Sequence, residues 1–277
     1  MPSLTNTIAV VTGASRGVGK GIALGLGEAG ATVYVTGRTS DSPPHQGRGS
    51  IEFTAAEVTR LGGQGIPVRC DHSNDHEVEA LFAQIQAEQG RLDLLVNNIW
   101  GGYERMSENG EWTWERPFWE QPVWRWDAMF HAGVRAHFVA SRLAAPMMIK
   151  QHGGLIVTIS FWAAQKHLGN LLYGMAKAAT DKFAADSAVE LRPHEVTSVA
   201  LYPGLVRTEA VMANAEWLDL SNSESPQFVG RVVAALAGDS AKLQHSGTVL
   251  LTAQLAQKYG VVDIDGKTIR PITLMEA

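Results

Sequence analysis

Cysteine is almost absent from this sequence, which contains a single one, Cys70, in 277 residues. One thiol excludes an intrachain disulfide and any metal site built on several cysteines. Such cysteine usage is typical of a reducing compartment, so we expect a cytoplasmic protein. The histidines at 72, 76, 131 and 137 and the scattered carboxylates show no metal-ligand spacing, so we expect no metal site.

Long apolar runs and basic stripes are also missing. No uninterrupted apolar run approaches about 18 residues, and the N-terminal stretch lacks the pattern of a secretory signal, so no membrane association is expected. The chain carries 23 Lys and Arg against 28 Asp and Glu, a net charge of −5, which argues against nucleic acid as a partner. With 45% hydrophobic residues the chain can bury a substantial core. Neither a nucleic acid nor a membrane is therefore expected as the main partner.

Apolar, β-rich runs alternate with helix-length amphipathic segments. We expect strands at 8–12, 32–36, 65–70, 92–96, 155–160, 197–202 and 248–252. Helices are expected at 18–29, 53–61, 75–89, 126–151, 173–191 and 226–236. Strands joined through helices require crossover connections, hence a parallel sheet covered on both faces. The prediction is one α/β domain over residues 1–277 with seven parallel strands, a polar loop at 40–50 and an aromatic-rich insertion at about 99–125.

A glycine-rich turn, Thr-Gly-Ala-Ser-Arg-Gly-Val-Gly at 12–19, follows the first expected strand and opens the first expected helix. Glycines let the backbone approach a pyrophosphate, whose charge the free N–H groups of a helix start stabilise. A turn of this kind can also be an ordinary strand-to-helix connection. Its place at the start of a βα unit favours a dinucleotide site, with contacts from Gly13, Ser15, Arg16, Gly17, Val18 and Gly19.

The cofactor type is indicated at the end of the second expected strand, where Gly37 is followed by Arg38. NAD-binding folds carry an acidic residue here for the ribose hydroxyls, whereas a nearby Arg accommodates the 2′-phosphate of NADP. No carboxylate is present, and Arg16 and Arg38 offer two guanidinium groups for charge-assisted hydrogen bonds. Arg38 could instead be a solvated surface charge. The pattern favours NADP(H).

Tyr173 and Lys177 stand four residues apart at the start of an expected helix, so their side chains share one helical face. A free tyrosine has a pKa of about 10, too high for proton exchange with an alkoxide at neutral pH. A neighbouring ammonium favours the phenolate and should lower that pKa. The pair predicts a proton donor or acceptor, although Tyr-x-x-x-Lys by itself is a common spacing.

Taken in order, these motifs resemble the short-chain dehydrogenase/reductase family over nearly the whole chain. Further matches are Asp71 after the third strand, Asn97 and Asn98 after the fourth, and Pro-Gly-Leu-Val-Arg-Thr at 203–208. Gly133 and the tail Tyr-Gly-Val-Val-Asp at 259–263 indicate one particular branch of the family.

The resemblance implies a Rossmann-type fold and an NADP(H)-dependent oxidoreductase, a carbonyl reductase in which Tyr173 exchanges the proton. It also implies the cofactor contacts. Asp71 would meet the adenine, Asn97 would pack near the adenosine ribose, and Lys177 would hold the nicotinamide ribose. The motif at 203–208 would close the nicotinamide end, with Val206 and Thr208 on the carboxamide and Pro203 and Gly204 beside them.

Three positions depart from the family pattern. Ile99 and Trp100 replace the usual Ala-Gly after the asparagine pair, and Gly133 stands where a catalytic Asn is usual. The catalytic Ser is ambiguous: strand alignment puts Phe161 in its place, whereas the usual gap of thirteen residues to the tyrosine selects Ser160. A hydroxyl can polarise a substrate oxygen and a phenyl ring cannot, which favours Ser160. The alternative function is a catalytically degenerate NADP-binding or scaffold protein.

The aromatic-rich insertion contains six of the eight tryptophans, at 100, 112, 114, 119, 124 and 126. It follows the fourth strand at the carboxyl edge of the sheet, where ligands bind in such folds. The rings could line a pocket for a bulky apolar substrate, or attach a long loop to the body or to a neighbouring subunit. The resemblance further implies a homodimer or homotetramer formed through the helices at 126–150 and 173–191.

Overall fold

The computed structural model describes residues 2–40 and 49–277, so most of the polar loop predicted at 40–50 lies outside the described residues. Its main sheet has seven strands in the order β3-β2-β1-β4-β7-β8-β9, and every neighbouring pair is parallel. The strands are β1 (Ile8–Val11), β2 (Thr32–Gly37), β3 (Gln64–Arg69), β4 (Leu94–Asn97), β7 (Gly154–Ile159), β8 (Val196–Tyr202) and β9 (Val249–Leu251). The prediction of a seven-stranded parallel sheet is confirmed.

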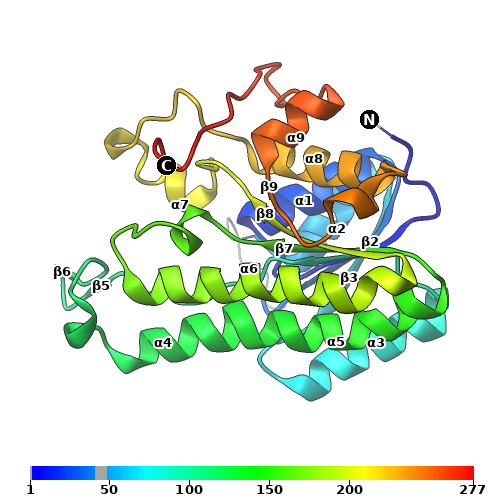
Figure 1. The fold of residues 1–277 in the computed structure, drawn as a ribbon, viewed down its shortest axis with the longest axis horizontal. Helices are drawn as coiled ribbons and strands as arrows, with labels where there is room; N and C mark the ends of the chain where they lie inside the picture. Colours follow the sequence, from blue (N-terminus) through cyan, green and yellow to red (C-terminus); the bar gives the residue numbers. More distant parts are fainter. Residues whose placement is uncertain (1, 41–48) are drawn as a thin grey trace.

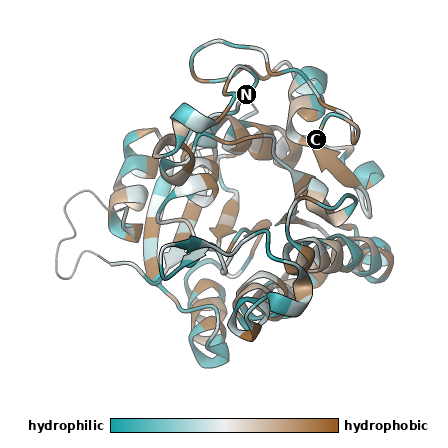
Figure 2. Ribbon diagram, turned by 90° about the vertical axis from the view of Figure 1, so that its left-hand side faces the viewer, coloured by the Kyte–Doolittle hydropathy of each residue, from teal (hydrophilic) through white to brown (hydrophobic). Residues whose placement is uncertain are grey.

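Helices cover both faces of this sheet (Figure 1). One face carries α1 (Gly17–Glu28), α2 (Ile51–Arg60), α8 (Pro226–Gly238) and α9 (Thr252–Tyr259). The other carries α3 (Asp75–Gln89), α4 (Val123–Phe130), α5 (Ala136–Lys150) and α6 (Leu171–Leu191). A short helix, α7 (Glu209–Met212), follows β8. The central strands are buried along their length and are mostly apolar, and brown segments mark their hydrophobic residues in Figure 2.

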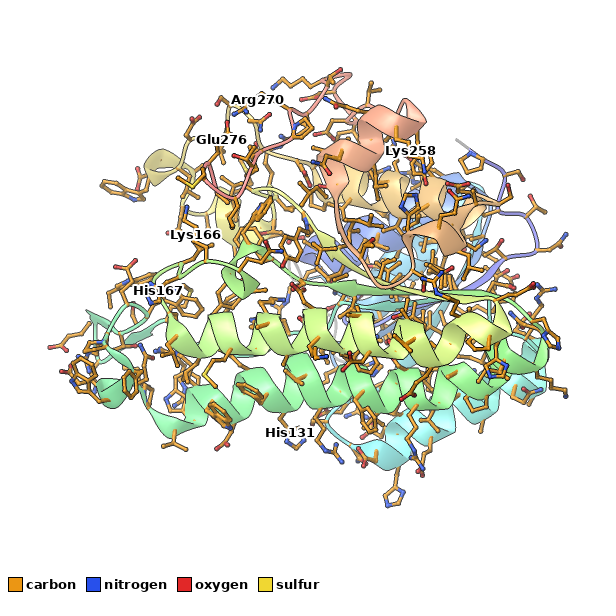
Figure 3. The ribbon with its side chains drawn as sticks, viewed as in Figure 1. His131, Lys166, His167, Lys258, Arg270 and Glu276 are labelled. Atoms are coloured by element: carbon orange, nitrogen blue, oxygen red, sulfur yellow. The ribbon has the colours of Figure 1, made fainter. Side chains whose placement is uncertain are left out.

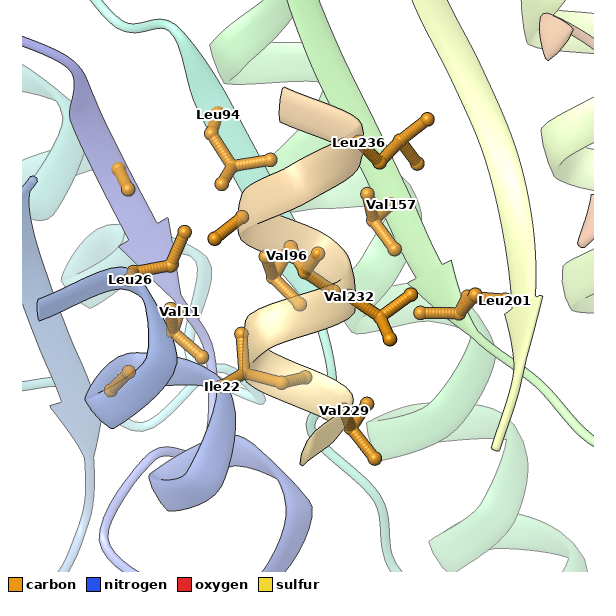
Figure 4. Close-up of a cluster of buried hydrophobic side chains, with 14 of the residues drawn as sticks. Val11, Ile22, Leu26, Leu94, Val96, Val157, Leu201, Val229, Val232 and Leu236 are labelled. Carbon is orange, nitrogen blue, oxygen red and sulfur yellow. The ribbon is translucent and has the colours of Figure 1, made fainter. Parts of the chain in front are cut away.

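The core on the first face is formed where α8 lies across the strands. Val229, Val232 and Leu236 of α8 point toward Val96, Val157 and Leu201 of the sheet (Figure 4). Helix α1 packs beside α8 at backbone distance: a Cβ on Gly21 would lie 2.0 Å from the carbonyl carbon of Pro226, and one on Gly25 would lie 2.3 Å from that of Gly230. The glycines of α1 therefore let the two helices touch, and this contact holds the N-terminus of α1 at the sheet edge.

The direction in which strands are added to the sheet reverses between β1 and β4. After β1 the chain builds β2 and β3 on one side, then crosses to place β4 on the other side of β1. Residues Leu94–Val96 of β4 pair with Ala9–Val11 on one side and with Leu155–Val157 on the other. Ligands of open α/β sheets bind at the carboxyl ends of the strands where such an order reverses.

Two elements differ from the sequence prediction. The helix expected at 126–151 begins earlier and is divided by a π-helical turn, His131–Arg135, between α4 and α5. The insertion contains a small hairpin, β5 (Ser107–Glu108) and β6 (Glu111–Trp112), beyond the start of α6 at one end of the molecule (Figure 1). Helices α7 and α9 were not predicted, because each is only one or two turns long.

Short 3₁₀ turns complete the fold, at Phe118–Glu120, Trp162–Ala164, Arg192–His194, Ala215–Trp217 and Lys242–His245. Residues 269–277 fold back over the loop that follows β7. Arg270 and Glu276 form an ion pair of 2.6 Å, and Lys166 donates to the carbonyl oxygens of Leu274, at 3.4 Å, and of Ala277 (Figure 3). Residues of this segment line a cavity together with Trp162, Pro203 and Gly204.

Candidate functional site

The glycine loop has the shape of an anion cradle. Gly13 and Gly17 have φ values of +66° and +58°, a left-handed conformation that favours glycine. Gly19 has no room for a side chain, because a Cβ there would lie 2.4 Å from both the Asn98 side-chain amide and the Gly13 carbonyl oxygen. Arg16 occupies the N-cap position of α1. Within the described residues its side chain makes no capping hydrogen bond to the first turn of the helix. Amide groups at such a helix start can bind phosphate.

Asn98 fixes this loop to the end of β4. Its side-chain amide donates to the carbonyl oxygens of Thr12, at 2.9 Å, and of Gly13, at 3.1 Å. In return the Thr12 hydroxyl oxygen accepts from the backbone amides of Asn98, at 2.9 Å, and of Ile99, at 3.1 Å. Sequence reasoning did not assign Asn98 to the site, although the Asn-Asn pair was the signal that could have identified it.

Asn97, the other member of that pair, has its side chain inside the protein. Its amide nitrogen donates to the Ser141 hydroxyl of α5 at 2.9 Å, and the residue is fully buried. Asn97 therefore faces α5, while the side chain that contacts the glycine loop is that of its neighbour Asn98.

Arg16 and Arg38 are exposed, and neither forms an ion pair within residues 2–40 and 49–277. Arg38 and Asp71 line a cavity of about 480 Å³ that also reaches Ile99 and Trp100. Partial burial disfavours the charged Asp71 carboxylate, but hydrogen bonds from Ser73 and the charge of Arg38 lower its pKa overall. Within the described residues, this part of the protein thus offers the Arg16 and Arg38 guanidinium groups, neither in an ion pair, and the Asp71 carboxylate.

The segment after β8 closes over the start of α1. Thr208 caps α7 by accepting from the Val211 amide at 3.3 Å, and its methyl carbon lies 3.6 Å from the position of a Cβ on Gly17. The next residue, Glu209, accepts the Gly17 amide hydrogen bond at 3.0 Å through its carboxylate. The loop from Pro203 to Thr208 is held by backbone hydrogen bonds to the buried Glu224. The Glu224 amide donates to the Leu205 carbonyl oxygen, and the Glu224 carbonyl oxygen accepts from the Arg207 amide, both at 2.8 Å. The predicted Pro-Gly motif and the glycine loop therefore meet.

Tyr173 and Lys177 share the inner face of α6, as the four-residue spacing predicts. The Asn170 side chain caps the helix by accepting from the Tyr173 amide at 2.9 Å. The Lys177 ammonium lies 5.8 Å from the centre of the Tyr173 ring and donates to the carbonyl oxygen of Ile159, the last residue of β7, at 3.1 Å. Burial lowers the pKa of Lys177 to about 7, and the Asp181 carboxylate opposes this shift. The lysine can therefore change its charge near neutral pH.

Aromatic rings enclose Tyr173. The ring centres of Trp100, Tyr103, Trp114 and Phe161 lie 5.5, 5.9, 5.6 and 6.3 Å from that of Tyr173. Burial, together with the hydrogen bond to Tyr103, raises the Tyr173 pKa well above its ordinary value. The predicted lowering of this pKa by Lys177 is therefore wrong for this arrangement, because desolvation by the rings outweighs the neighbouring cation.

The structure separates the two candidates for the serine position. Ser160 is buried, and its hydroxyl donates to the Lys177 carbonyl oxygen at 3.3 Å and accepts from the Thr180 hydroxyl at 3.2 Å. Phe161 packs instead in the cluster around Tyr173. Successive residues of an extended chain point to opposite sides, so only one of the two can face Tyr173.

The tryptophans of the insertion have different roles. Trp100 and Trp114 lie against Tyr173, whereas Trp112 and Trp119 are 54% and 73% exposed. The loop itself is held by Arg125, which is fully buried and donates to the carbonyl oxygens of Thr113, at 3.0 Å, and of Arg105, at 2.8 Å. Sequence reasoning missed Arg125, since nothing local distinguishes a buried arginine from a solvated one. The contacts of Arg125 attach the loop to itself and to α4, whereas the lining of a substrate pocket by the rings stays a prediction.

No three His, Cys, Asp or Glu side chains of residues 2–40 and 49–277 gather in a way that could hold a metal ion. Over the same residues, no helix is both long enough and apolar enough to cross a bilayer.

The chain is similar to known proteins over most of its length. A family model described as short chain dehydrogenase matches residues 7–219. "Dehydrogenase/reductase SDR family member 1" of Mus musculus is 44% identical over 277 residues, which cover 95% of this chain and 85% of the relative. This relative represents the branch that Gly133 and the tail at 259–263 indicate.

Solved structures agree with this similarity. A 7α-hydroxysteroid dehydrogenase complexed with NADH and 7-oxo glycochenodeoxycholic acid matches with a TM-score of 0.75 and 26% identity over 98% of this chain and 97% of its own. A metagenomic short-chain oxidoreductase in complex with NADP matches with a TM-score of 0.70 and 28% identity, over 90% and 96%. With its seven-stranded sheet and glycine loop, the chain belongs to the short-chain dehydrogenase/reductase family of oxidoreductases, which use nicotinamide cofactors to interconvert alcohols and carbonyl compounds.

Proposed function

We propose that this protein is an NADP(H)-dependent carbonyl reductase in which Tyr173 and Lys177 form the proton relay. The observation that carries the proposal is the placement of this pair. Lys177 is bonded to the end of β7, and Tyr173 lies against Trp100, two residues beyond the Asn98 that clamps the glycine loop. A proton donor and a dinucleotide cradle thus share one edge of the sheet.

The residues present fit a dinucleotide. Gly13, Gly17 and Gly19 leave the loop open to a pyrophosphate, because a side chain at any of them would be strained or would clash. Arg16 and Arg38, exposed and without ion pairs in the described part of the chain, would hold a 2′-phosphate. At the two ends of the cofactor, Asp71 would contact the adenine, and Val206 and Thr208 would hold the carboxamide of the nicotinamide. When bound, the cofactor supplies or accepts a hydride.

The chain's own residues would move the proton. With a pKa well above 10, the Tyr173 phenol is protonated at neutral pH and can donate to an alkoxide oxygen. The phenolate that this leaves is stabilised by the Lys177 ammonium, 5.8 Å from the ring. In the opposite direction the phenolate accepts the proton of an alcohol. The surrounding rings exclude water from this exchange and favour a bulky, apolar substrate.

The experiment is a comparison of the protein with Tyr173→Phe. The variant keeps the ring and its packing but lacks the hydroxyl, so NADPH should still bind while reduction of a panel of apolar carbonyl compounds falls about 10²-fold or more. Leu172→Met, a neighbouring substitution of similar volume in the same helix turn, serves as the control and should retain activity. Near-normal reduction by Tyr173→Phe would contradict the mechanism.

One observation favours a second function, an NADP-binding or scaffold protein without turnover. The ring of Phe161 stands beside Tyr173 while the Ser160 hydroxyl is engaged with α6, and Gly133 supplies no side chain. In that case NADPH would bind the unmodified protein with no turnover of any carbonyl in the panel, and Tyr173→Phe would change nothing measurable.

A further inference from the structure

A single aromatic ring connects two of the positions at which the sequence departs from its family. A Cβ on Gly133 would lie 2.4 Å from the Cζ3 atom of Trp100 and 2.5 Å from its Cε3 atom. Both distances are far below van der Waals contact, so no residue with a side chain fits at 133 while the ring keeps its place. The indole at 100 and the glycine at 133 are therefore one structural feature, although 33 residues separate them in the sequence.

The backbone on both sides of this contact is held in place. Gly133 lies in the middle of the π-helical turn His131–Arg135, a type of irregularity that is frequent at functional sites. His137, in the first turn of α5, contacts the carbonyl oxygen of Ile99 through its Nε2 atom at 2.9 Å. Gly101 packs against the Ala128 carbonyl oxygen of α4, where a Cβ would lie at 2.8 Å. The position of Trp100 is thus determined by its neighbours on α4 and α5.

The same indole contacts the proposed proton relay. The Lys177 ammonium lies 3.9 Å from the centre of the Trp100 ring, and the Tyr173 ring meets that indole edge-on at 5.5 Å and 80°. Lys177 is 5% exposed, and within the described residues its ammonium donates to one acceptor, the Ile159 carbonyl oxygen. A buried cation with so few hydrogen bonds needs another source of stabilisation, and an aromatic face can provide it.

We propose that Trp100 is a positioning residue of the active centre, whose ring occupies the volume above Gly133 and holds the Lys177 ammonium beside Tyr173. The catalytic purpose of these contacts rests on the proposed role of Lys177 in the proton relay. The contacts of Trp100 with Gly133 and Lys177 do not depend on that role. The other ionisable groups that face Lys177 are Asp181 on its own helix, His137 on α5 and Tyr173. Of these, only the Asp181 carboxylate favours the charged lysine.

The first experiment tests the contact between the cation and the ring in the protein without cofactor. At pH 6 Lys177 is charged and at pH 9 it is largely neutral, since burial holds its pKa at about 7. Trp100→Leu should therefore raise the unfolding equilibrium constant about tenfold more at pH 6 than at pH 9, as expected for a desolvated cation–π contact. Trp100→Phe should restore most of this difference, and in a Lys177→Met background the difference should vanish.

Trp126→Leu is the matched control, because Trp126 stacks on Phe130 at 4.0 Å and contacts no cation within the part of the chain that is described. Trp126→Leu should raise the unfolding equilibrium constant by the same factor at pH 6 and at pH 9. An equal cost of Trp100→Leu at pH 6 and pH 9, or a pH difference that persists without Lys177, would overturn the proposal.

The second experiment uses a double-mutant cycle to test whether the Trp100 ring fills the space beside Gly133. Gly133→Ala should raise the unfolding equilibrium constant by tenfold or more in the presence of Trp100, as overpacking does, and by less than about threefold in a Trp100→Ala background. Gly153→Ala, at a position where a Cβ meets nothing within 4 Å, should be nearly neutral in both backgrounds. Equal costs of Gly133→Ala in the two backgrounds would show that the ring does not occupy this volume.

Activity then separates this inference from the proposed function. If Trp100 positions Lys177, Trp100→Leu should lower kcat for carbonyl reduction about tenfold. In the pH profile of kcat, the apparent pKa that belongs to Lys177 should fall by about one unit. Trp100→Phe should behave much like the unmodified protein in both measurements. A protein that reduces no carbonyl would contradict the proposed function alone, because both unfolding experiments need neither cofactor nor substrate.

Discussion

At the scale of single residues, this site consists of polar groups whose properties depend on burial. Lys177 and Tyr173 have pKa values displaced in opposite directions, the lysine down to about 7 and the tyrosine well above 10, and burial is the largest cause in both. Each shift favours the neutral form. In the proposed relay, the site would therefore donate a proton from a neutral phenol rather than hold a phenolate in advance.

Arg38 carries the prediction on cofactor choice. Arg38→Ala removes a guanidinium that has no ion pair within the described residues, so the fold should be unaffected while NADPH affinity falls roughly 10- to 100-fold, the scale of a charge-assisted hydrogen bond. NADH affinity should change little. Titration of both cofactors against the two proteins measures this, with Arg69→Ala, an exposed arginine on β3 paired with Glu77, as the control. Equal affinity of the unmodified protein for NADPH and NADH would contradict the assignment to NADP(H).

Ser160 allows a test of which side chain faces the substrate. Because its hydroxyl bonds the Lys177 carbonyl oxygen and Thr180, Ser160→Ala should change kcat by less than about threefold and lower the melting temperature, as the loss of a buried hydrogen bond does. Steady-state kinetics and thermal unfolding of the same variant provide both measurements. A fall in kcat of about 10²-fold would instead show that Ser160 polarises the substrate oxygen, as the spacing to Tyr173 predicts.

At the scale of elements, the site is an assembly of three loops at the carboxyl ends of β1, β4 and β8. The loop after β4 lies between the other parts: Asn98 binds the glycine loop, and Trp100 packs against Tyr173 and Lys177. The loop after β8 reaches the glycine loop through Thr208 and Glu209. The elements are rigid, and their ends bring residues of distant segments within contact distance.

Glu209 gives the prediction for these loops. Its carboxylate accepts the Gly17 amide at the start of α1, where a cofactor pyrophosphate would carry negative charge too. Glu209→Gln should therefore tighten NADPH binding about two- to fivefold, because repulsion between the two anions is lost. Calorimetric titration measures the affinity, and Glu216→Gln, exposed in the same segment, should leave it unchanged. Weaker binding by Glu209→Gln would show that the carboxylate supports the cofactor instead.

At the scale of the whole molecule, helices α4, α5 and α6 present an apolar groove at the surface. It encloses about 550 Å³, and its apolar lining residues, Trp126, Phe130, Val134, Phe138 and Phe183, lie among the polar Asp127, His131, Arg135, His137 and Thr180. Phe138 is 52% exposed and meets Phe183 edge-on at 6.5 Å. Patches of this kind on folded proteins usually mark contact surfaces. This groove is where the predicted dimer would form.

Phe138→Glu tests that assembly. A charge in the middle of a symmetric apolar contact appears twice, so the variant should be monomeric where the unmodified protein is a dimer or tetramer, with an unchanged circular dichroism spectrum. Light scattering after gel filtration measures the mass. Phe53→Glu, equally exposed at 51% on α2 at the other face of the sheet, should keep the native assembly. A monomeric unmodified protein at micromolar concentration would refute the prediction.

Stability toward acid depends on buried histidine. Burial, and to a smaller extent the charge of Lys177, lowers the pKa of His137 from 6.5 to about 3. Between these values the unfolded chain binds a proton that the folded protein does not, so stability falls as the pH falls, by about 1.4 kcal/mol per pH unit. Below pH 3 and above pH 6.5 this contribution is constant.

A comparison of variants isolates His137, because burial raises the pKa of Glu224 to about 7 and this carboxyl acts in the opposite direction over much of the same range. Urea unfolding of the unmodified protein and of His137→Gln between pH 6.5 and 4.5 should show the steeper loss of stability in the former. The exposed His76→Gln should follow the unmodified protein. Parallel slopes for all three proteins would contradict the assignment.

Features that depend on local pattern could be predicted from the amino-acid sequence alone. Strand and helix periods predicted the seven parallel strands, and the spacing of Gly13, Gly17 and Gly19 predicted the cradle, since both follow from backbone geometry over a few residues. The four-residue interval between Tyr173 and Lys177 placed them on one face for the same reason.

The side chains that surround these groups could not be predicted in this way, because they come from segments that are distant in the sequence. The ring of Trp100 lies over Gly133, the carboxylate of Glu209 reaches Gly17 from 192 residues away, and Phe161 rather than Ser160 packs beside Tyr173. The predicted direction of the Tyr173 pKa shift was wrong because the lysine is a sequence neighbour, whereas Trp100, Tyr103 and Trp114 come from a distant loop. Electrostatic environment depends on the packing of segments far apart in the chain, and no local period encodes it.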